Sequence, residues 1–495
     1  MYAFKKFKCP DYNSNLGLFL SAIILLKPSF ADNINGESFP SNFIFGASTS
    51  AYQIEGAWNE DGKGEGVWDH ITHVSNISIA DRSSGDVACD SYHKVDEDIA
   101  MLKHLGVDYY RFSIAWSRIV PNGNVSQGVN LPGVMYYLRL LEKLERENIS
   151  AMVTIFHYDL PQALSFPTMF IDENYNSLYV DYARLAFLLF GNKVKYWITF
   201  NEPQGVCTSF LEKYSTKPGT DSYTCTHNII KCHAMTYWMY DSDFRDDQKG
   251  QVGIVLNTNW DEPASQDAKD IEAAKRKLLF EVGWYAHPLV FGDYPDEMKT
   301  RIRLYTFPWE SSRLPKFTDE EKSLIKGTLD FIGLNHYSTS LVSDAPDPGL
   351  FRTYEKDLGI LKTYDPSWEK TSLDWFYVVP FGLRKILNWL DETYKVPIII
   401  TENGYVEDGS PFLDDDRRIN YYQTYLSNVL DAIYIDHVNV IGYFTWSLMD
   451  NWEWTSGYTQ KFGLYYVNFS SPTRDRLPKK SVAYYKKVLK TRRLV

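Results

Sequence analysis

Eight apolar segments spread along almost the whole chain constrain the fold of this 495-residue protein more than any other feature. Each is rich in β-branched or aromatic residues and therefore predicts a buried strand. The segments lie at residues 43–50, 108–116, 151–157, 196–201, 252–258, 331–336, 397–401 and 440–447. Most of them are separated by helical periodicity, for example at residues 92–105, 133–147, 178–190, 381–394 and 417–435.

This alternation of strands and helices indicates the fold class. Apolar strands that alternate with helices favour a parallel sheet, and eight such units favour a closed (β/α)8 TIM barrel of the α/β class. The alternative is a doubly wound open sheet, but no Gly-x-Gly-x-x-Gly motif follows the first strand. We expect a single domain at residues 36–492 with long loops. Residues 344–368, rich in Pro, Asp and Gly, are expected to form one of those surface loops.

The N-terminus has the pattern of a signal peptide. Three lysines precede an apolar run at residues 16–26, which is too short to span a bilayer, and small residues end at Ala31. We expect cleavage after Ala31, which makes residues 1–31 a signal peptide and the protein secreted; a signal anchor is the alternative. No other window is long and apolar enough to cross a membrane. Secretion agrees with four predicted glycosylation sites at Asn76, Asn124, Asn148 and Asn468.

Cysteine content and charge restrict the fold and the partners further. Outside the predicted signal peptide, the cysteines are Cys89, Cys207, Cys225 and Cys232. They are too few for a disulfide framework, but one bridge among the three clustered ones is expected, and the sequence does not select the pair. The net charge of −12 disfavours nucleic acids and anionic membranes and favours neutral small molecules.

Two of the expected strands end in glutamate. The segment 196–203 reads Tyr-Trp-Ile-Thr-Phe-Asn-Glu-Pro, and the segment 396–404 reads Val-Pro-Ile-Ile-Ile-Thr-Glu-Asn-Gly. Because catalytic groups of a barrel lie at the carboxyl ends of its strands, Glu202 and Glu402 are predicted to meet at one mouth. No metal-ligand spacing and no Gly-x-Ser-x-Gly motif occur in the sequence, so no metal or cofactor is expected. A carboxylate pair with hydrogen-bonding neighbours is the set that glycoside hydrolysis requires.

The same motifs resemble glycoside hydrolase family 1, the β-glucosidase and myrosinase family, and insect members in particular. The two signatures are Thr-Phe-Asn-Glu-Pro at 199–203 and Ile-Thr-Glu-Asn-Gly at 400–404. Further matches lie at residues 45–56, 110–118, 331–337 and 442–451, in the order that the family has them. The resemblance covers nearly the whole mature chain. It implies a retaining β-glycosidase that acts on a small β-glycoside, and a β-glucosidase is the first choice.

The resemblance also implies roles for individual residues. Glu202 would be the acid/base and Glu402 the nucleophile of a double displacement, which requires carboxyl groups about 5–5.5 Å apart, whereas inversion requires about 6.5–9.5 Å. Arg111, Asn335 and Tyr337 would orient and stabilise the nucleophile. The sugar would be contacted by Gln53, His157, Asn201, Trp446, Glu453 and Trp454. If the resemblance is set aside, His157 could be a core histidine, and Trp446 and Trp454 could be packing residues.

The chain departs from the family pattern on the leaving-group side. Tyr158 stands where the family usually has Trp, and residues 165–170 and 210–214 replace its usual glycine-rich stretches. The aglycone is therefore not readable from the sequence. If it were sulfated, as in the glucosinolates that myrosinases cleave, Lys213 or Arg313 could supply a cation.

Two alternatives to a β-glucosidase follow from the same resemblance. A myrosinase is one, although plant-type myrosinases replace the acid/base with Gln and Glu202 is present here. A non-catalytic, klotho-like binding protein is the other, although such proteins typically lose one or both glutamates. Glu55, Glu65, Arg118 and Asp159 are interpreted as structural or solvated residues.

Overall fold

The computed structural model describes residues 37–74, 79–164, 170–210, 215, 217–307, 309–345, 352–409 and 413–495. Its centre is a closed barrel in which every neighbouring strand pair is parallel, in the order β1-β13-β12-β7-β5-β4-β3-β2. The barrel strands are β1 (Ile44–Ser48), β2 (Tyr109–Ser113), β3 (Ser150–Phe156), β4 (Val194–Asn201), β5 (Gln251–Asn257), β7 (Phe331–Asn335), β12 (Ile398–Asn403) and β13 (Val440–Trp446). The predicted (β/α)8 barrel is confirmed, and each of the eight expected strands overlaps one of these.

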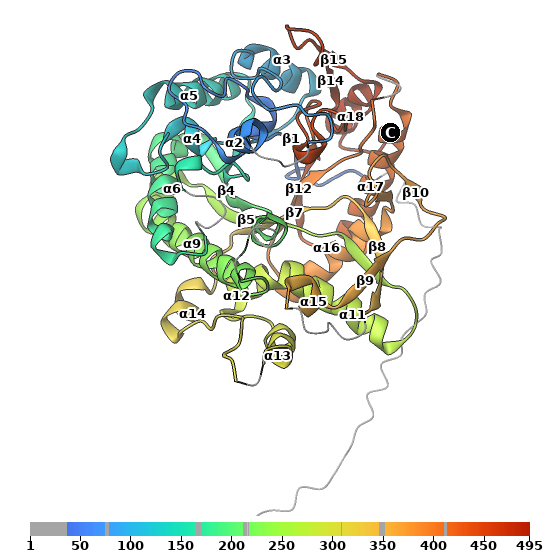
Figure 1. Cartoon of the computed structure of the whole chain (residues 1–495). Coiled ribbons are helices and arrows are strands. Elements are labelled where there is room, and N and C mark those ends of the chain that lie inside the picture. The colour runs from blue at the N-terminus through green and yellow to red at the C-terminus, as the bar shows by residue number, and fades with distance from the viewer. Residues whose placement is uncertain are drawn as a thin grey trace, which may run out of the picture.

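Helices surround the barrel as an outer ring (Figure 1). The longer ones are α3 (Val95–Leu105), α5 (Leu131–Arg146), α6 (Asn176–Phe190), α9 (Asp221–Asp243), α11 (Ala268–Leu278), α12 (Trp284–Phe291), α16 (Phe381–Tyr394), α17 (Asp416–Tyr434) and α18 (Lys480–Thr491). Their ends follow from local chemistry. In α3, for example, three acidic residues occupy the first turn, where they interact favourably with the helix dipole. Gly106, directly after the last helical residue Leu105, adopts φ 79° and ends the helix.

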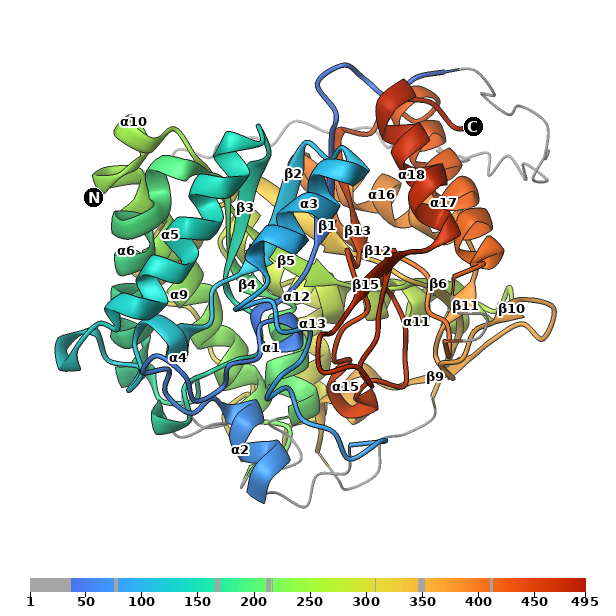
Figure 2. The same cartoon turned by 90° about the horizontal axis from the view of Figure 1, so that it is seen from above.

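Shorter helices fill the connections between these elements. They are α1 (Ala51–Ile54), α2 (Val67–Val74), α4 (Trp116–Ile119), α7 (Pro203–Gly205), α10 (Arg245–Gln248), α13 (Asp296–Leu304), α14 (Asp319–Ile325) and α15 (Tyr354–Leu358). Figure 2 shows the barrel from the side, with α1 and α2 at one end of the strands and α10 at the other. Because α1 and α7 directly follow β1 and β4, the end with α1 is the carboxyl end of the strands.

Six fully buried side chains form a separate cluster, one from each of the neighbouring strands β3, β4, β5, β7, β12 and β13. They are Met152, Ile198, Val255, Phe331, Ile399 and Phe444. The much larger core cluster contains the residues of the barrel helices and the strand faces that pack against them. Burying each of these large side chains contributes about 1.5–3 kcal/mol, so the barrel is a packed support and not a pore.

A small three-stranded sheet extends the barrel beyond the ends of β5 and β7. It has the order β6-β8-β9, with β6 (Trp260–Pro263), β8 (Thr339–Asp344) and β9 (Ile360–Thr363). Figure 1 shows β8 and β9 side by side, close to α11 and α15. Two further pairs, β10 (Glu369–Lys370) with β11 (Tyr377–Val378) and β14 (Tyr465–Val467) with β15 (Arg476–Pro478), are antiparallel.

The extension corrects the expectation of a surface loop at residues 344–368. Part of this segment forms α15 and β9, and Tyr354, Asp357 and Leu358 are buried. The polar composition suggested exposure, but the Asp357 carboxylate is buried against the guanidinium of Arg313 and the hydroxyl of Tyr223. Residues 346–351 lie outside the described part of the chain.

One disulfide joins Cys207 to Cys225, which confirms the expected bridge among the clustered cysteines. Cys89 and Cys232 are buried free thiols. Of the predicted glycosylation sites, Asn148 is exposed, Asn124 and Asn468 are partly exposed, and Asn76 lies outside the described residues, as does the predicted signal peptide. Among the helices of the described ranges, none has the length and apolar composition that spanning a membrane requires.

Candidate active site

A cavity of about 560 Å³ at the carboxyl end of the barrel brings the predicted site residues together. Nine of the eleven candidates line it: His157, Asn201, Glu202, Asn335, Tyr337, Glu402, Trp446, Glu453 and Trp454. The other two are fully buried behind the cavity wall: Arg111 contacts Glu402, and Gln53 contacts Glu453. Residues from strands that are far apart in the sequence therefore converge on one cavity.

Glu402, the second-last residue of β12, contacts a cation and a phenol. Arg111 Nη1 donates to its Oε1 at 2.6 Å, and the Tyr337 hydroxyl donates to its Oε2 at 2.7 Å. Only 5% of the Glu402 side chain and none of the Arg111 side chain is exposed. The guanidinium and the hydroxyl stabilise a negative charge on this carboxylate, which suits a nucleophile.

Glu202 has quite different surroundings. Asn335 Nδ2 donates to its Oε1 at 2.6 Å and the Tyr158 hydroxyl donates to its Oε2 at 3.0 Å, both neutral groups. Burial, and next the negative charge of Glu402, raises the pKa of Glu202 to about 7, against the opposing effects of these two hydrogen bonds and of Arg111. A carboxyl group with this pKa holds a proton near neutral pH, which suits a general acid.

The backbone of Glu202 is strained. It adopts φ 45° and ψ 54° between the end of β4 and Pro203, the first residue of α7. Its N–H donates to the Val255 carbonyl oxygen of the neighbouring strand β5 at 2.9 Å, so the conformation is fixed by the barrel. A non-glycine residue in this region costs about 1–3 kcal/mol, and such residues cluster at active sites.

The contacts of Asn335 differ from those predicted. In the β7–β12 register Asn335 is the partner of Glu402, but its Nδ2 contacts Glu202 at 2.6 Å and Asn201 Oδ1 at 3.2 Å. The reason is the Thr401 hydroxyl, which donates to Asn335 Oδ1 at 2.7 Å and so turns the amide nitrogen towards β4. The side-chain amide of Asn335 thus contacts Glu202 and not Glu402, which differs from the prediction, whereas Arg111 and Tyr337 contact Glu402.

The two glutamates divide the ring of strands into two arcs. Along the shorter arc, only β5 and β7 lie between β4 and β12; along the longer arc lie β3, β2, β1 and β13. His157, Trp446, Glu453 and Gln53 all end or follow strands β3, β13 and β1 of the longer arc. Apart from Asn201, which ends β4 itself, the side chains predicted to contact the sugar thus occupy one side of the glutamate pair, with β5, β7 and their extensions on the other.

The polar groups of the longer arc, together with Asn201 at the end of β4, can form hydrogen bonds with hydroxyl groups. Asn201 Oδ1 accepts from Arg111 at 2.6 Å, which leaves the Asn201 amide nitrogen facing His157 Nε2 at 3.4 Å. Among the described residues, His157 Nδ1 has no hydrogen-bond partner. Burial, and next the charge of Arg111, holds the pKa of His157 well below its usual range, so the ring is neutral and offers a donor and an acceptor.

Glu453 is the third carboxyl group of the cavity. Gln53 Nε2 donates to its Oε2 at 3.3 Å and to Asn451 Oδ1 at 2.9 Å. Burial, and next the charges of Glu402 and Glu202, raises the pKa of Glu453 to about 8. A neutral carboxyl group at this position can donate one hydrogen bond and accept others.

Two tryptophans give this side an aromatic surface. The His157 ring is nearly parallel to the rings of Trp446 and Trp454, with centroids 6.0 and 5.9 Å away. Aromatic faces beside neutral polar groups match the C–H faces and hydroxyls of a sugar ring, so this arc has the chemistry of a sugar pocket.

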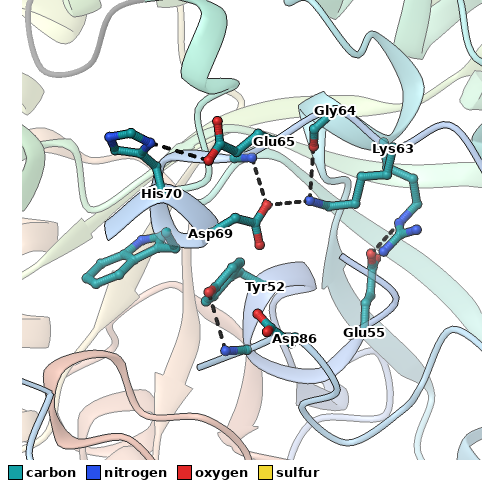
Figure 3. A network of polar contacts seen from close by, with 12 residues as sticks. Tyr52, Glu55, Lys63, Gly64, Glu65, Asp69, His70 and Asp86 are labelled. Carbon is teal, nitrogen blue, oxygen red and sulfur yellow. Dashed lines mark hydrogen bonds and ion pairs between the residues drawn. The ribbon is translucent and has the colours of Figure 1, made fainter. Parts of the chain in front are cut away.

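Figure 3 shows Glu55 and Glu65, two of the residues interpreted as structural or solvated, near α1 and α2. Glu55 is buried and pairs with Arg118 at 2.7 Å, while Glu65 is exposed beside His70. Asp159 is buried, and burial raises its pKa to about 8. None of these three carboxylates lines the cavity among the described residues. The burial of Glu55 and Asp159 away from this cavity agrees with their interpretation as structural residues.

Sequence reasoning missed other parts of the cavity. It did not predict that the Tyr158 hydroxyl contacts Glu202, although position 158 stood out as a departure from the family. Lys277, Glu281, Lys362 and Trp375 also line the cavity and were not selected. Arg313 is buried against Asp357 at 2.5 Å and so cannot serve as the suggested cation, while Lys213 lies outside the described residues. In the described ranges, no cluster of three or more metal-ligating side chains is suited to a metal ion.

The fold and the carboxyl pair define a glycoside hydrolase. The chain belongs to glycosyl hydrolase family 1, whose sequence model matches residues 35–494. Myrosinase 1 of Brevicoryne brassicae is 42% identical over 92% of this chain and 98% of its own length. Beta-glucosidase 34 of Oryza sativa subsp. japonica is 41% identical over 92% of each.

Solved structures agree with the sequence comparisons. Aphid myrosinase superposes with a TM-score of 0.85 and 41% identity, covering 92% of this chain and 99% of that one. A family 1 β-glucosidase from Humicola insolens in complex with glucose gives 0.86 and 36% identity, covering 92% and 99%. The lactase/phlorizin hydrolase of Rattus norvegicus is 42% identical over 91% of this chain, which spans only 24% of that longer protein.

Proposed function

We propose that the protein is a retaining β-glucosidase in which Glu402 is the nucleophile and Glu202 the acid/base. The observation that carries the proposal is the difference between the two carboxyl groups. Glu402 is paired with Arg111 and Tyr337, whereas Glu202 is bonded to neutral groups and has a pKa raised to about 7. Family membership and the two β-glucosidases described above support glucose as the sugar.

The mechanism follows from these roles. A Glu402 oxygen attacks the anomeric carbon while the proton of Glu202 passes to the departing glycosidic oxygen, so the C–O bond to the aglycone breaks and a glycosyl-enzyme ester forms. Glu202, now ionised, takes a proton from water. That water attacks the same carbon and releases Glu402 and glucose with retained configuration. We predict that the carboxyl groups lie about 5–5.5 Å apart, the separation that retention requires.

A substrate panel tests the proposal. The purified protein is given aryl β-glucoside, β-galactoside and β-fucoside, cellobiose and a glucosinolate. We expect turnover of the aryl β-glucoside, with β-glucose as the first product seen by NMR, and loss of activity in Glu402→Ala. No turnover of any substrate, α-glucose as the first product, or an unchanged Glu402→Ala variant would contradict the proposal.

A myrosinase is the second candidate. Its support is the likeness to myrosinase 1 of Brevicoryne brassicae and to the solved aphid myrosinase. Cleavage of a glucosinolate does not need the general acid that Glu202 supplies, but the presence of Glu202 does not exclude this activity. Release of glucose from the glucosinolate faster than from every other member of the panel would replace the β-glucosidase assignment by this one.

Secretion is part of the proposal. The signal-peptide pattern of residues 1–31 supports it, as does the Cys207–Cys225 disulfide, because disulfides persist in oxidising compartments. Expression of the full chain in insect cells tests it. We expect medium-borne protein that begins at Asp32 and loses mass on enzymatic deglycosylation; retention in the cells with an intact N-terminus would contradict it.

A further inference from the structure

The shorter arc of the cavity carries two lysines with different surroundings. Lys277 on α11 lies 2.6 Å from the Asp261 carboxylate and 2.6 Å from the Glu281 carboxylate, and only 4% of its side chain is exposed. The Thr258 hydroxyl also donates to Glu281 at 2.8 Å. The charge and the donors of Lys277 are therefore already used within the protein.

Lys362 has no such partner. It lies on β9, at the edge of the β6-β8-β9 sheet opposite Val342 of β8, and lines the same cavity as Glu202 and Glu402. Over the residues that the structure describes, no carboxylate oxygen comes within 4.0 Å of its ammonium group. Among the described residues, the Tyr364 ring lies 5.7 Å from its ammonium group. The ammonium donors of Lys362 are thus available to a ligand in the cavity.

The side chain of Lys362 is exposed, and the charges around it are mixed. Partial loss of water around its ammonium group, and next the positive charge of Lys277, lowers the pKa of Lys362, while Asp261 and Glu281 act at longer range in the opposite direction. An anionic group beside Lys362 would give its ammonium group a charged partner. The cavity also has an aromatic wall, because Trp375 lines it and is 41% exposed.

The position of Lys362 relates it to the leaving group. The sugar-side residues belong to the longer arc, whereas β6, β8 and β9 continue β5 and β7 of the shorter arc. A substrate whose glucose occupies the longer arc places its aglycone towards Lys362 and Trp375. We infer that Lys362 is a specificity-determining residue that selects aglycones carrying an anionic substituent, such as a carboxylate or a sulfate, on an aromatic or similar apolar body.

This inference rests on the proposed glucosidase function, and its test separates the two. The substrates are 4-carboxyphenyl and 4-sulfatophenyl β-D-glucoside, each compared with neutral 4-carbamoylphenyl β-D-glucoside. The measured quantity is the ratio of kcat/KM for the anionic to that for the neutral substrate. Intrinsic leaving-group reactivity cancels when the same ratio is compared between variants.

The variants are Lys362→Met, which removes the charge at similar length, and Lys362→Glu, which reverses it. Lys385→Met is the matched control, because Lys385 pairs with Glu262 of the same small sheet and is absent from the cavity lining among the described residues. We expect the ratio to fall about three- to tenfold in Lys362→Met, mainly through KM, and further in Lys362→Glu. It should stay within about twofold in the control, within the range of ordinary surface substitutions.

The outcomes are distinct. A ratio that falls for both anions supports the inference, and a fall for one anion alone identifies which one the site prefers. Ratios unchanged in both Lys362 variants would overturn the inference while leaving the glucosidase proposal intact. If the wild-type protein cleaves none of the three glucosides, the proposed function itself fails.

Discussion

Asn335 pairs in register with Glu402 but donates its hydrogen bond to Glu202, at 2.6 Å. This places Asn335 beside the group with the raised pKa and away from the carboxylate paired with Arg111. A donor to a carboxylate stabilises its ionised form, so Asn335 lowers the pKa of Glu202 against the effects of burial and of Glu402.

Asn335→Ala should therefore raise the pKa of Glu202 above its value of about 7. The enzyme needs Glu202 protonated, so the alkaline limb of kcat/KM against pH should move to higher pH while the maximum rate falls. Tyr158→Phe, which removes the other donor to Glu202, should move the limb the same way. Tyr337→Phe removes a donor to Glu402 and should lower the rate without moving the limb upward. An alkaline limb fixed in Asn335→Ala would contradict this contact.

Glu202→Gln should affect substrates according to their leaving groups. An alkyl or unactivated phenyl glucoside needs a proton on its departing oxygen, and we expect kcat/KM to fall about 10²- to 10⁴-fold. A 2,4-dinitrophenyl glucoside needs little help and should lose far less in the glycosylation step. The alkaline limb near pH 7 should disappear in the variant. Glu65→Gln, a change at an exposed acid outside the cavity lining, is the control; an equal loss for both substrates would argue against an acid role.

The fold and most of the site were predictable because they depend on local patterns. Eight apolar runs specified the barrel strands, and Glu202 and Glu402 follow from strand ends alone. The turn of the Asn335 amide was not predictable, since it depends on the Thr401 hydroxyl of a strand 66 positions away. Lys362 was equally hidden: it belongs to a segment that reads as a polar loop, and its importance arises only from the sheet that β8 and β9 form.

Gly404 illustrates a motif residue whose role is steric. A Cβ atom added there would lie 1.8 Å from the carbonyl oxygen of Trp446. Gly404→Ala should push the loop after Glu402 away from Trp446, and we predict about a tenfold or greater loss of kcat/KM, because misplacement of about 1 Å can cost two orders of magnitude. Gly409→Ala, where the nearest atoms are 3.5 Å away on a lysine side chain, is a comparison within the same loop, although its φ of 96° adds strain. Wild-type activity in Gly404→Ala would show that the loop can adjust.

Asp159→Asn should change how stability depends on pH. The pKa of Asp159 is about 8 in the folded protein and 3.8 as its ordinary value, so the folded state binds this proton more tightly. Its contribution to stability is therefore complete below about pH 4 and is lost as the pH rises towards 8. The variant, which cannot ionise, should melt about 2–5 °C above wild type at pH 8 and close to it at pH 4.5. A difference in Tm that is independent of pH, as expected for the exposed control Asp246→Asn, would contradict the buried protonated state.

The Cys207–Cys225 bridge should contribute to stability. It closes a loop with a sequence separation of 18 residues, for which about 3 kcal/mol is expected. Replacing both cysteines by serine should lower the midpoint of denaturant unfolding accordingly. Peptide mapping of the native protein should find these two linked, with Cys89 and Cys232 alkylated only after unfolding, because both are buried. A linked pair that includes Cys232 would contradict the assignment.

The identity of the nucleophile is the central claim, and covalent trapping tests it most directly. The enzyme is incubated with 2,4-dinitrophenyl 2-deoxy-2-fluoro-β-D-glucoside, which forms the glycosyl-enzyme but hydrolyses slowly, and the digest is examined by mass spectrometry. We predict that the fluoroglucosyl group is attached to Glu402, in the peptide that contains Thr401 and Asn403. A label on Glu202, or no label while the enzyme turns over other glucosides, would contradict the account.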